Sequence, residues 1–295
     1  MLKASARISD ILKQAVAHGQ SAIALTDHGN MFGILEFYMV AKDLKKKGVD
    51  IKAILGSHIY VEDESLGSAV QSRDEGQLNR IVLLAENDTG YRNLVKITSW
   101  RFETPERWAP IPVIPLAVLK QYGEGLIAIT GEFFSRLGSD LLQGRDANAL
   151  RWIESLCAIF DKSHLFLCLQ DHGIPEQPQL NNKLRGLSVA HNLPLVVTQN
   201  VHYIHSEDAQ AHKALLCIGE VRKLHDYESK AYPTDQFYLK SSEEMEALFP
   251  NDAEALANSG LIAQRCNVTI KTGVGDTYWP KFEFPPEFAD GDEYI

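Results

Sequence analysis

The chain has 295 residues, of which 45% are hydrophobic and 23% are charged, and its formal net charge is −10. This length suits one large domain or two small ones. The acidic balance argues against a protein that holds nucleic acid through bulk electrostatics, because phosphate binding needs a clustered positive face. No apolar run approaches the ~18 residues that a membrane-spanning helix needs, so we expect no membrane contact.

The cysteine pattern points to a reducing compartment. The four cysteines are far apart in the sequence and form no C-x-x-C pair, which is typical of reduced thiols in a cytosolic protein. We therefore expect a cytoplasmic protein.

Short apolar runs alternate with longer amphipathic segments along the chain. Expected strands are Ala22–Leu25, Lys52–Leu55 with Ile59–Val61 just after, Ile81–Ala85, Leu126–Ile129, Leu165–Leu169 and Leu195–Thr198. Expected helices are Ile8–His18, Phe32–Lys47, Gly90–Trp100, Ala147–Phe160, Gln179–His191, Glu207–Ile218, Glu243–Phe249 and Ala253–Arg265. This repetition predicts an α/β fold with a parallel sheet or a barrel, and helices of this length favour the barrel.

Two proline-rich stretches interrupt this pattern. The region Arg101–Pro115 has four prolines and is expected to be a loop with an edge segment. The tail from Lys271 onward has prolines at 280, 285 and 286 and no helical or strand period. We therefore expect one domain over residues 1–270, followed by an extended linker over residues 271–295.

Polar side chains gather where the expected strands end. In an α/β barrel the carboxyl ends of the strands build the active site, so these side chains should converge at one mouth. Histidine and carboxylate together suit zinc or manganese, whose bound water could attack a phosphate ester. The residues are Asp27, His28, His58, Glu132, His172, Asn200 and His202.

The same residues also admit structural roles. Asp27 could form an Asx turn ahead of Gly29, and His172 could serve the turn at Gly173. His28 and His202 could be packed core histidines. No G-x-G-x-x-G, G-x-x-x-x-G-K-[ST] or G-x-S-x-G motif occurs, so nucleotide-binding folds and serine hydrolases have no motif support.

Several long motifs together resemble the N-terminal PHP domain of the alpha subunit of bacterial DNA polymerase III, a C-family replicative polymerase. They are ALTDHGNMFGILEFY, LLAENDTGYRNLVKI, LQDHGIPEQ, VHYIHSEDAQAHKALLCI and ALANSGLIAQRCNVTI, in the family's order. The resemblance implies a distorted seven-stranded β/α barrel of the PHP type. It also implies that the chain begins after the family's first strand and its His-x-His motif, and that residues 271–295 lead toward a palm domain.

The resemblance further implies a degenerate metal site. In the family, histidines, carboxylates and sometimes a cysteine hold zinc or manganese. Here the remnant ligands would be His28, His58, Glu132 and His202, while Asn200 replaces an aspartate. Lys3 and Arg80 replace an aspartate and a histidine of the family's site.

Lys3 and Arg80 would place permanent positive charge where metal ions should lie. Two unit charges about 4 Å apart repel by roughly 4 kcal/mol at an effective dielectric of 20, and a divalent ion feels about twice that. We therefore expect these cations to replace the metals and to neutralise Asp27 and Glu132 through charge-assisted hydrogen bonds. No cofactor is expected, and zinc or manganese would bind only if the remnant site is still occupied.

The resemblance implies that the full-length protein is a DNA-directed DNA polymerase, a nucleotidyltransferase of DNA replication. This chain lacks the polymerase active site and would be a structural module. Its expected partners are the palm and thumb of the same subunit and other replisome subunits, with DNA reached only through the full-length protein. The alternatives are a metal-dependent phosphoesterase or 3′–5′ exonuclease of the PHP superfamily, and a purely structural or interaction module.

Overall fold

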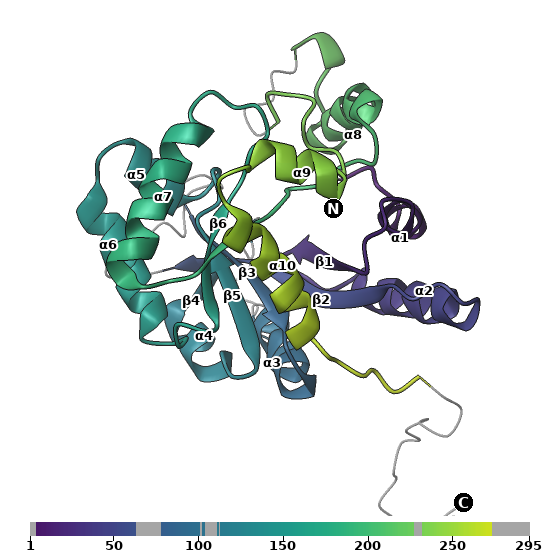
Figure 1. Ribbon diagram of the computed structural model, residues 1–295, viewed down its shortest axis with the longest axis horizontal. Helices are drawn as coiled ribbons and strands as arrows, with labels where there is room; N and C mark the ends of the chain where they lie inside the picture. Colours follow the sequence, from purple (N-terminus) through teal and green to yellow (C-terminus); the bar gives the residue numbers. More distant parts are fainter. Residues whose placement is uncertain are drawn as a thin grey trace, which may run out of the picture.

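A seven-stranded sheet forms the centre of the molecule and helices surround it (Figure 1). The computed structural model describes residues 4–62, 78–100, 102–103, 111, 113–226 and 232–272. The strands are β1 (Ala22–His28), β2 (Lys52–Glu62), β3 (Asn79–Ala85), β4 (Val113–Pro115), β5 (Leu126–Thr130), β6 (Leu165–Leu169) and β7 (Leu195–Val197).

The strand order is β1-β2-β3-β5-β6-β7, with β4 paired to β2 beside this path. The sequence predicts parallel pairing, and the pairs β1–β2, β2–β4, β5–β6 and β6–β7 are parallel. The exception is β3, which runs antiparallel to both β2 and β5. Parallel neighbours need a long crossover, usually a helix, and the sequence predicts no helix between β2 and β3. The result is a mixed, curled sheet, which confirms the expected α/β class and agrees with a distorted barrel.

β2 is one continuous strand, although the sequence predicts two segments separated by Gly56, Ser57 and His58. Gly56 is required there by close packing. A Cβ on Gly56 would lie 2.7 Å from the carbonyl oxygen of Leu83 on β3. The glycine therefore marks a close approach of two strands, and not a break in one.

Among the described residues, all eight expected helices are present close to their predicted bounds, and two short α-helices were missed. The missed helices are α4, which directly follows β4, and α5, whose N-cap Ser135 accepts a hydrogen bond from the Gly138 amide. The helices are α1 (Ile8–Ala17), α2 (Ile34–Lys46), α3 (Asp88–Ser99), α4 (Leu116–Tyr122), α5 (Arg136–Leu142), α6 (Asp146–Cys157), α7 (Gln177–His191), α8 (Ala209–Glu220), α9 (Ser242–Leu248) and α10 (Ala253–Arg265).

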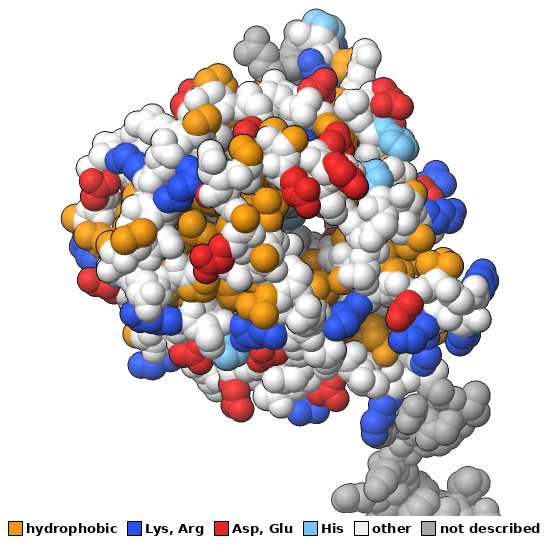
Figure 2. Space-filling model, in the orientation of Figure 1, with side chains coloured by type: hydrophobic (Ala, Val, Ile, Leu, Met, Phe, Trp, Pro, Cys, Tyr) orange, Lys and Arg blue, Asp and Glu red, His pale blue; other side chains and the backbone are white. Residues whose placement is uncertain are grey.

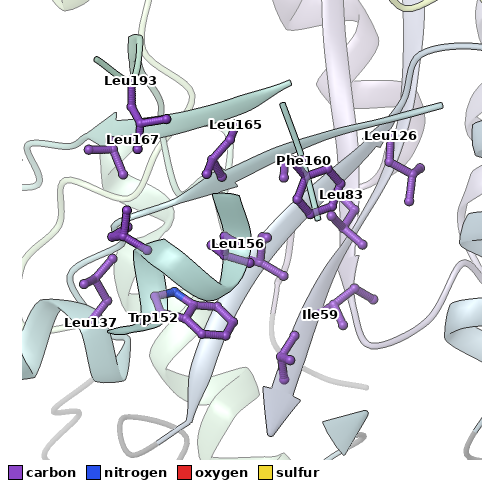
Figure 3. Packing of buried hydrophobic residues seen from close by; sticks show 14 of the residues in the cluster. Ile59, Leu83, Leu126, Leu137, Trp152, Leu156, Phe160, Leu165, Leu167 and Leu193 are labelled. Atoms are coloured by element: carbon purple, nitrogen blue, oxygen red, sulfur yellow. The ribbon is translucent and has the colours of Figure 1, made fainter. Parts of the chain in front are cut away.

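The main hydrophobic core lies between the sheet and the helices α3 to α7 (Figure 3). Trp152 of α6 is fully buried, and its indole N–H donates to the Thr130 hydroxyl at 3.3 Å. Leu83, Leu126 and Leu165 are buried in the same cluster. Burial of each such side chain is worth roughly 1.5–3 kcal/mol, so this side of the sheet is firmly fixed.

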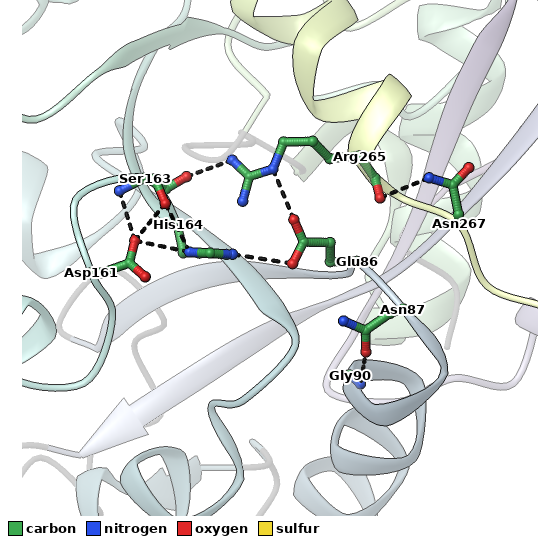
Figure 4. A network of polar contacts seen from close by, with 8 residues as sticks. All are labelled: Glu86, Asn87, Gly90, Asp161, Ser163, His164, Arg265 and Asn267. Carbon is green, nitrogen blue, oxygen red and sulfur yellow. Dashed lines mark hydrogen bonds and ion pairs between the residues drawn. The ribbon is translucent and has the colours of Figure 1, made fainter.

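A polar network ties α10 to the sheet at the end of β3 (Figure 4). The Arg265 guanidinium donates to Glu86 at 2.8 Å, and Nε2 of His164 lies 3.1 Å from the same carboxylate. Nδ1 of His164 lies 2.9 Å from Asp161. Because these residues come from α10, from the segment after β3 and from the turn before β6, we call this network the Glu86 clamp.

Three expectations lie wholly or partly outside the described residues. These are the extended linker beyond Thr272, the placement of Lys3 and most of the loop expected over Arg101–Pro115. Of that last region, the edge segment is present as β4, which pairs with β2. Within the described ranges, the structure contains no helix with the length and apolar character needed to cross a bilayer.

Candidate functional site

Four of the residues singled out in the sequence meet at one end of the sheet. His28 ends β1, and His58 is its register partner on β2, with the two rings 4.4 Å apart between centroids. The His202 ring lies 6.4 Å from that of His28. Glu132 follows β5 and lies beside His58. His28, His58, Glu132 and His202 therefore form one cluster. His28 and Glu132 lie at strand ends as expected, whereas His58 lies inside the continuous strand β2.

Glu132 and His58 form the closest acid–base contact of the cluster. Oε2 of Glu132 lies 2.8 Å from Nε2 of His58, which is an ion-pair distance. Burial would raise the pKa of the Glu132 carboxyl, but the His58 ring and then Arg80 outweigh it and lower this pKa to about 2. Glu132 is therefore a buried carboxylate in its charged form, with the Arg80 guanidinium as a fixed positive charge nearby.

Arg80 supplies a fixed positive charge inside the cluster. It faces Tyr60 across the β2–β3 pair, and its guanidinium carbon lies 5.3 Å from the Tyr60 ring centroid. Nη1 donates to the Phe134 carbonyl at 2.7 Å and Nη2 to the Tyr60 hydroxyl at 3.3 Å. The expected cation is thus placed at the site. It acts on Glu132 through its charge, while these hydrogen bonds go to Phe134 and Tyr60.

Tyr60 is the site residue that the sequence analysis missed. Its hydroxyl accepts from Arg80 and lies 3.0 Å from Nδ1 of His28. A hydroxyl that already accepts from a guanidinium is well placed to donate its own proton to an imidazole nitrogen. The sequence did contain a signal for Tyr60. Side chains two residues apart in a strand lie on the same face, so Tyr60 shares the face of β2 that carries His58.

His202 is held by an amide and by aromatic rings. Its Nε2 lies 2.9 Å from Oδ1 of Asn200, and the rings of Tyr232 and His212 lie 4.4 and 5.4 Å away. The Asn200 backbone N–H donates to Nε2 of His172 at 3.1 Å. A histidine nitrogen that accepts an N–H is unprotonated, and burial accordingly lowers the pKa of His172 to about 3.

Asp27 points into the turn that starts α2. Its Oδ2 accepts the Gly33 N–H at 3.1 Å. The Asx turn expected at Asp27 is instead made by Asn30, whose Oδ1 accepts the Phe32 N–H at 3.0 Å. The sequence correctly indicated turn chemistry here, but it assigned the turn to the wrong residue.

The described residues do not by themselves fit a metal centre. Nδ1 of His28 contacts the Tyr60 hydroxyl and Nε2 of His202 contacts Asn200, and the Arg80 cation is buried beside them. Across the described ranges, no three His, Cys, Asp or Glu side chains gather in a way that could hold a metal ion. We therefore derive no metal-dependent step from this site.

A large cavity opens beside the cluster, between β1 and β7, the first and last strands in the order of the sheet. Its volume is about 1400 Å³, and its lining includes Ala24 of β1 and Val196 of β7 as well as His28 and His202 at the rim. Ala24 is exposed although it lies in the middle of a strand. Figure 2 shows the surface hollowed between α10 and α1. We call this space the β1–β7 groove.

The start of the described chain crosses the rim of this groove. The backbone N–H groups of Ser5 and Ala6 donate to the His202 carbonyl, at 2.9 and 3.3 Å. Ala4 and Ala6 contribute to the lining. The segment before α1 is therefore anchored to the loop that carries a site histidine.

Comparison with known proteins places the chain in a family. Residues 1–172 match the PHP domain family, and the chain belongs to it. This confirms the resemblance indicated by the sequence motifs.

The chain is also similar to DNA polymerase III subunit alpha from several bacteria. It is 36% identical to that of Treponema pallidum over 100% of the chain, 34% identical to that of Thermus aquaticus over 97%, and 32% identical to that of Escherichia coli K12 over 99%. It spans 24%, 23% and 23% of these proteins, about a quarter of the length of the curated relatives that it matches.

A solved structure described as a metal-dependent phosphoesterase, from Bifidobacterium adolescentis, is also similar in outline. It has a TM-score of 0.45 and 11% identity, and the match covers 68% of this chain and 84% of that one.

Proposed function

We propose that this chain is the PHP module of a replicative DNA polymerase subunit, and that its histidine cluster is a structural centre without hydrolytic activity. The proposal rests on similarity along the whole chain to DNA polymerase III subunit alpha. Its partners would be the palm and thumb of the same subunit and other replisome subunits in the cytoplasm. It would reach DNA only through the full-length protein, which carries the nucleotidyltransferase activity.

The observation that carries the structural role is the buried Arg80 guanidinium. It is 6% exposed and lies in the same cluster as Glu132 and His58. A divalent ion placed there would meet a fixed like charge, at a cost of several kcal/mol. The Arg80 guanidinium already balances the charge of the Glu132 carboxylate. A metal would therefore be redundant as well as repelled.

Metal analysis of the purified chain tests this role. We expect less than stoichiometric zinc and manganese, no rise in melting temperature when either metal is added, and no manganese-dependent hydrolysis of p-nitrophenyl phosphate or of the 3′ end of single-stranded DNA. Stoichiometric bound metal together with hydrolysis that Glu132→Gln abolishes would instead establish the phosphoesterase or exonuclease alternative.

We further propose that the β1–β7 groove is the place of the strand that the resemblance expects ahead of the described chain. Within the described ranges β1 pairs only with β2, and β7 only with β6. Each of the two strands therefore has one row of backbone groups facing the groove. An unpaired row of this kind is a template for a further strand. The anchoring of Ser5 at the His202 carbonyl would let such a strand end at the rim and run parallel to both neighbours.

A further inference from the structure

The exposed side of α2 carries one continuous stripe that changes character along its length. Leu35, Met39, Lys42 and Lys46 recur at the spacing of one helical face, and Phe32 lies just ahead of the helix. Phe32 and Leu35 are 70% and 55% exposed. We call these five residues the α2 stripe. It is apolar in its first half and carries two lysines in its second half, where Lys46 also donates to Asp43 of the same helix at 2.8 Å.

The described chain ends against the middle of this stripe. The backbone N–H of Asn267 donates to the Glu86 carbonyl at 2.7 Å, and that of Thr269 to the Asp88 carboxylate at 2.9 Å. Nζ of Lys42 then donates to the Thr272 hydroxyl at 2.7 Å. The chain is thus held at the start of α3 by Thr269 and contacts α2 at Thr272, its last described residue.

Residues 273–295 have a composition that complements the stripe. Their acidic residues are Asp276, Glu283, Glu287, Asp290, Asp292 and Glu293, against the single basic residue Lys281. Their aromatic residues are Tyr278, Trp279, Phe282, Phe284, Phe288 and Tyr294. Carboxylates suit the lysines of the stripe, and aromatic rings suit its exposed apolar half.

The geometry permits the contact in either direction along the helix. A 13-residue helix such as α2 is about 20 Å long, and an extended chain covers about 3.3 Å per residue. Since the chain leaves from beside Lys42, about four to five residues reach either end of α2.

We infer that the 273–295 segment docks on the α2 stripe, with its carboxylates on Lys42 and Lys46 and its aromatic rings on Phe32 and Leu35. The docked segment would fix the direction in which the chain leaves the domain. This inference does not depend on whether the histidine cluster is structural or hydrolytic.

Chymotrypsin cleavage and zero-length cross-linking of the full chain test the docking. In the wild type we expect slow cleavage after Tyr278, Phe282 and Phe288, the aromatic residues of 278–288 that no proline follows. We also expect carbodiimide cross-links that join Lys42 or Lys46 to acidic residues of 276–293. The double variant Lys42→Glu, Lys46→Glu should be cleaved there at least tenfold faster and should lose those cross-links.

The matched control is the double variant Lys213→Glu, Lys223→Glu, which makes the same charge change at the α8 end of the molecule. It should keep the wild-type cleavage rate. A second variant, Leu35→Ser, removes an exposed apolar contact without a change of charge and should also speed cleavage. The inference is overturned if the wild type is cleaved as fast as the Lys42→Glu, Lys46→Glu variant, or if its cross-links fall on other lysines.

Discussion

The individual side chains around Glu132 show how neighbouring groups of the protein itself favour the charged form of a buried carboxylate. His58 touches it, and Arg80 of β3 acts on it through its charge. Tyr60 connects Arg80 to His28 by hydrogen bonds. Arg80 has two roles in this arrangement. Its charge favours the ionised form of Glu132, and its guanidinium donates a hydrogen bond to the Phe134 carbonyl.

Replacement of Arg80 by alanine should therefore destabilise the fold. Removal of one partner from a buried charged network leaves the others uncompensated, and we expect a loss of about 2–4 kcal/mol in the free energy of unfolding. Urea denaturation at pH 7 measures it. Arg151→Ala, on the exposed face of α6, should change the same quantity by less than about 0.5 kcal/mol. Equal effects of the two substitutions would contradict this account.

The neutral His172 gives the molecule a dependence on acid. Burial lowers its folded-state pKa to about 3, below the ordinary value of about 6.5. The free energy of unfolding therefore keeps its full contribution from the neutral His172 above pH ~6.5. It decreases as the pH falls toward 3, by up to about 1.4 kcal/mol per pH unit.

Chemical denaturation between pH 7 and pH 5 measures the free energy of unfolding as a function of pH. This free energy should fall with the slope given above in the wild type and less steeply in His172→Gln, whose amide cannot titrate. His191→Gln, at the end of α7, serves as the control and should keep the wild-type slope. If His172→Gln keeps it as well, the loss of stability comes from other groups.

At the scale of whole elements, the Glu86 clamp fixes α10 against the sheet. Burial would raise the pKa of Glu86, but the hydrogen bonds from Arg265 and His164 outweigh it and lower this pKa. A lowered carboxyl pKa contributes stability that is present above the ordinary value near 4.5 and is lost as the pH falls through the folded-state value.

Glu86→Gln should therefore cost about 1 kcal/mol at pH 7, and the difference from the wild type should shrink below pH 4. Chemical denaturation at the two pH values measures this, with Glu154→Gln on the surface of α6 as the control. A difference that stays constant from pH 7 to pH 3 would show that the charge of Glu86 is not what holds α10.

For the whole molecule, the sequence was most informative where hydrophobic period and strand-end chemistry coincide. The strand Leu165–Leu169 and the helix Ala253–Arg265 have the predicted bounds, because each has a strong pattern of its own. The direction of β3 was not predictable, since it depends on which strand it pairs with. Tyr60 was missed for a related reason: its role depends on Arg80, which lies opposite it only after β2 and β3 pair.

The groove is the feature of the whole molecule that no local pattern could reveal. If a strand belongs there, a variant of the chain with a strand-forming segment added ahead of Met1 should protect backbone amides of β1 and β7 from hydrogen exchange by at least tenfold. Amides of β6, which already has two neighbours, provide the internal control. Unchanged exchange in β1 and β7 would show that the groove is not a place for a strand.

The anchoring of Ser5 and Ala6 to the His202 carbonyl has a practical consequence for handling the protein. A purification tag or fluorophore fused ahead of Ser5 would pull directly on the loop that presents a site histidine. A label on the carboxy-terminal side would instead be joined to a chain whose last described residue, Thr272, accepts a hydrogen bond from Lys42 of α2. Ligand titrations are therefore better read from a carboxy-terminal label.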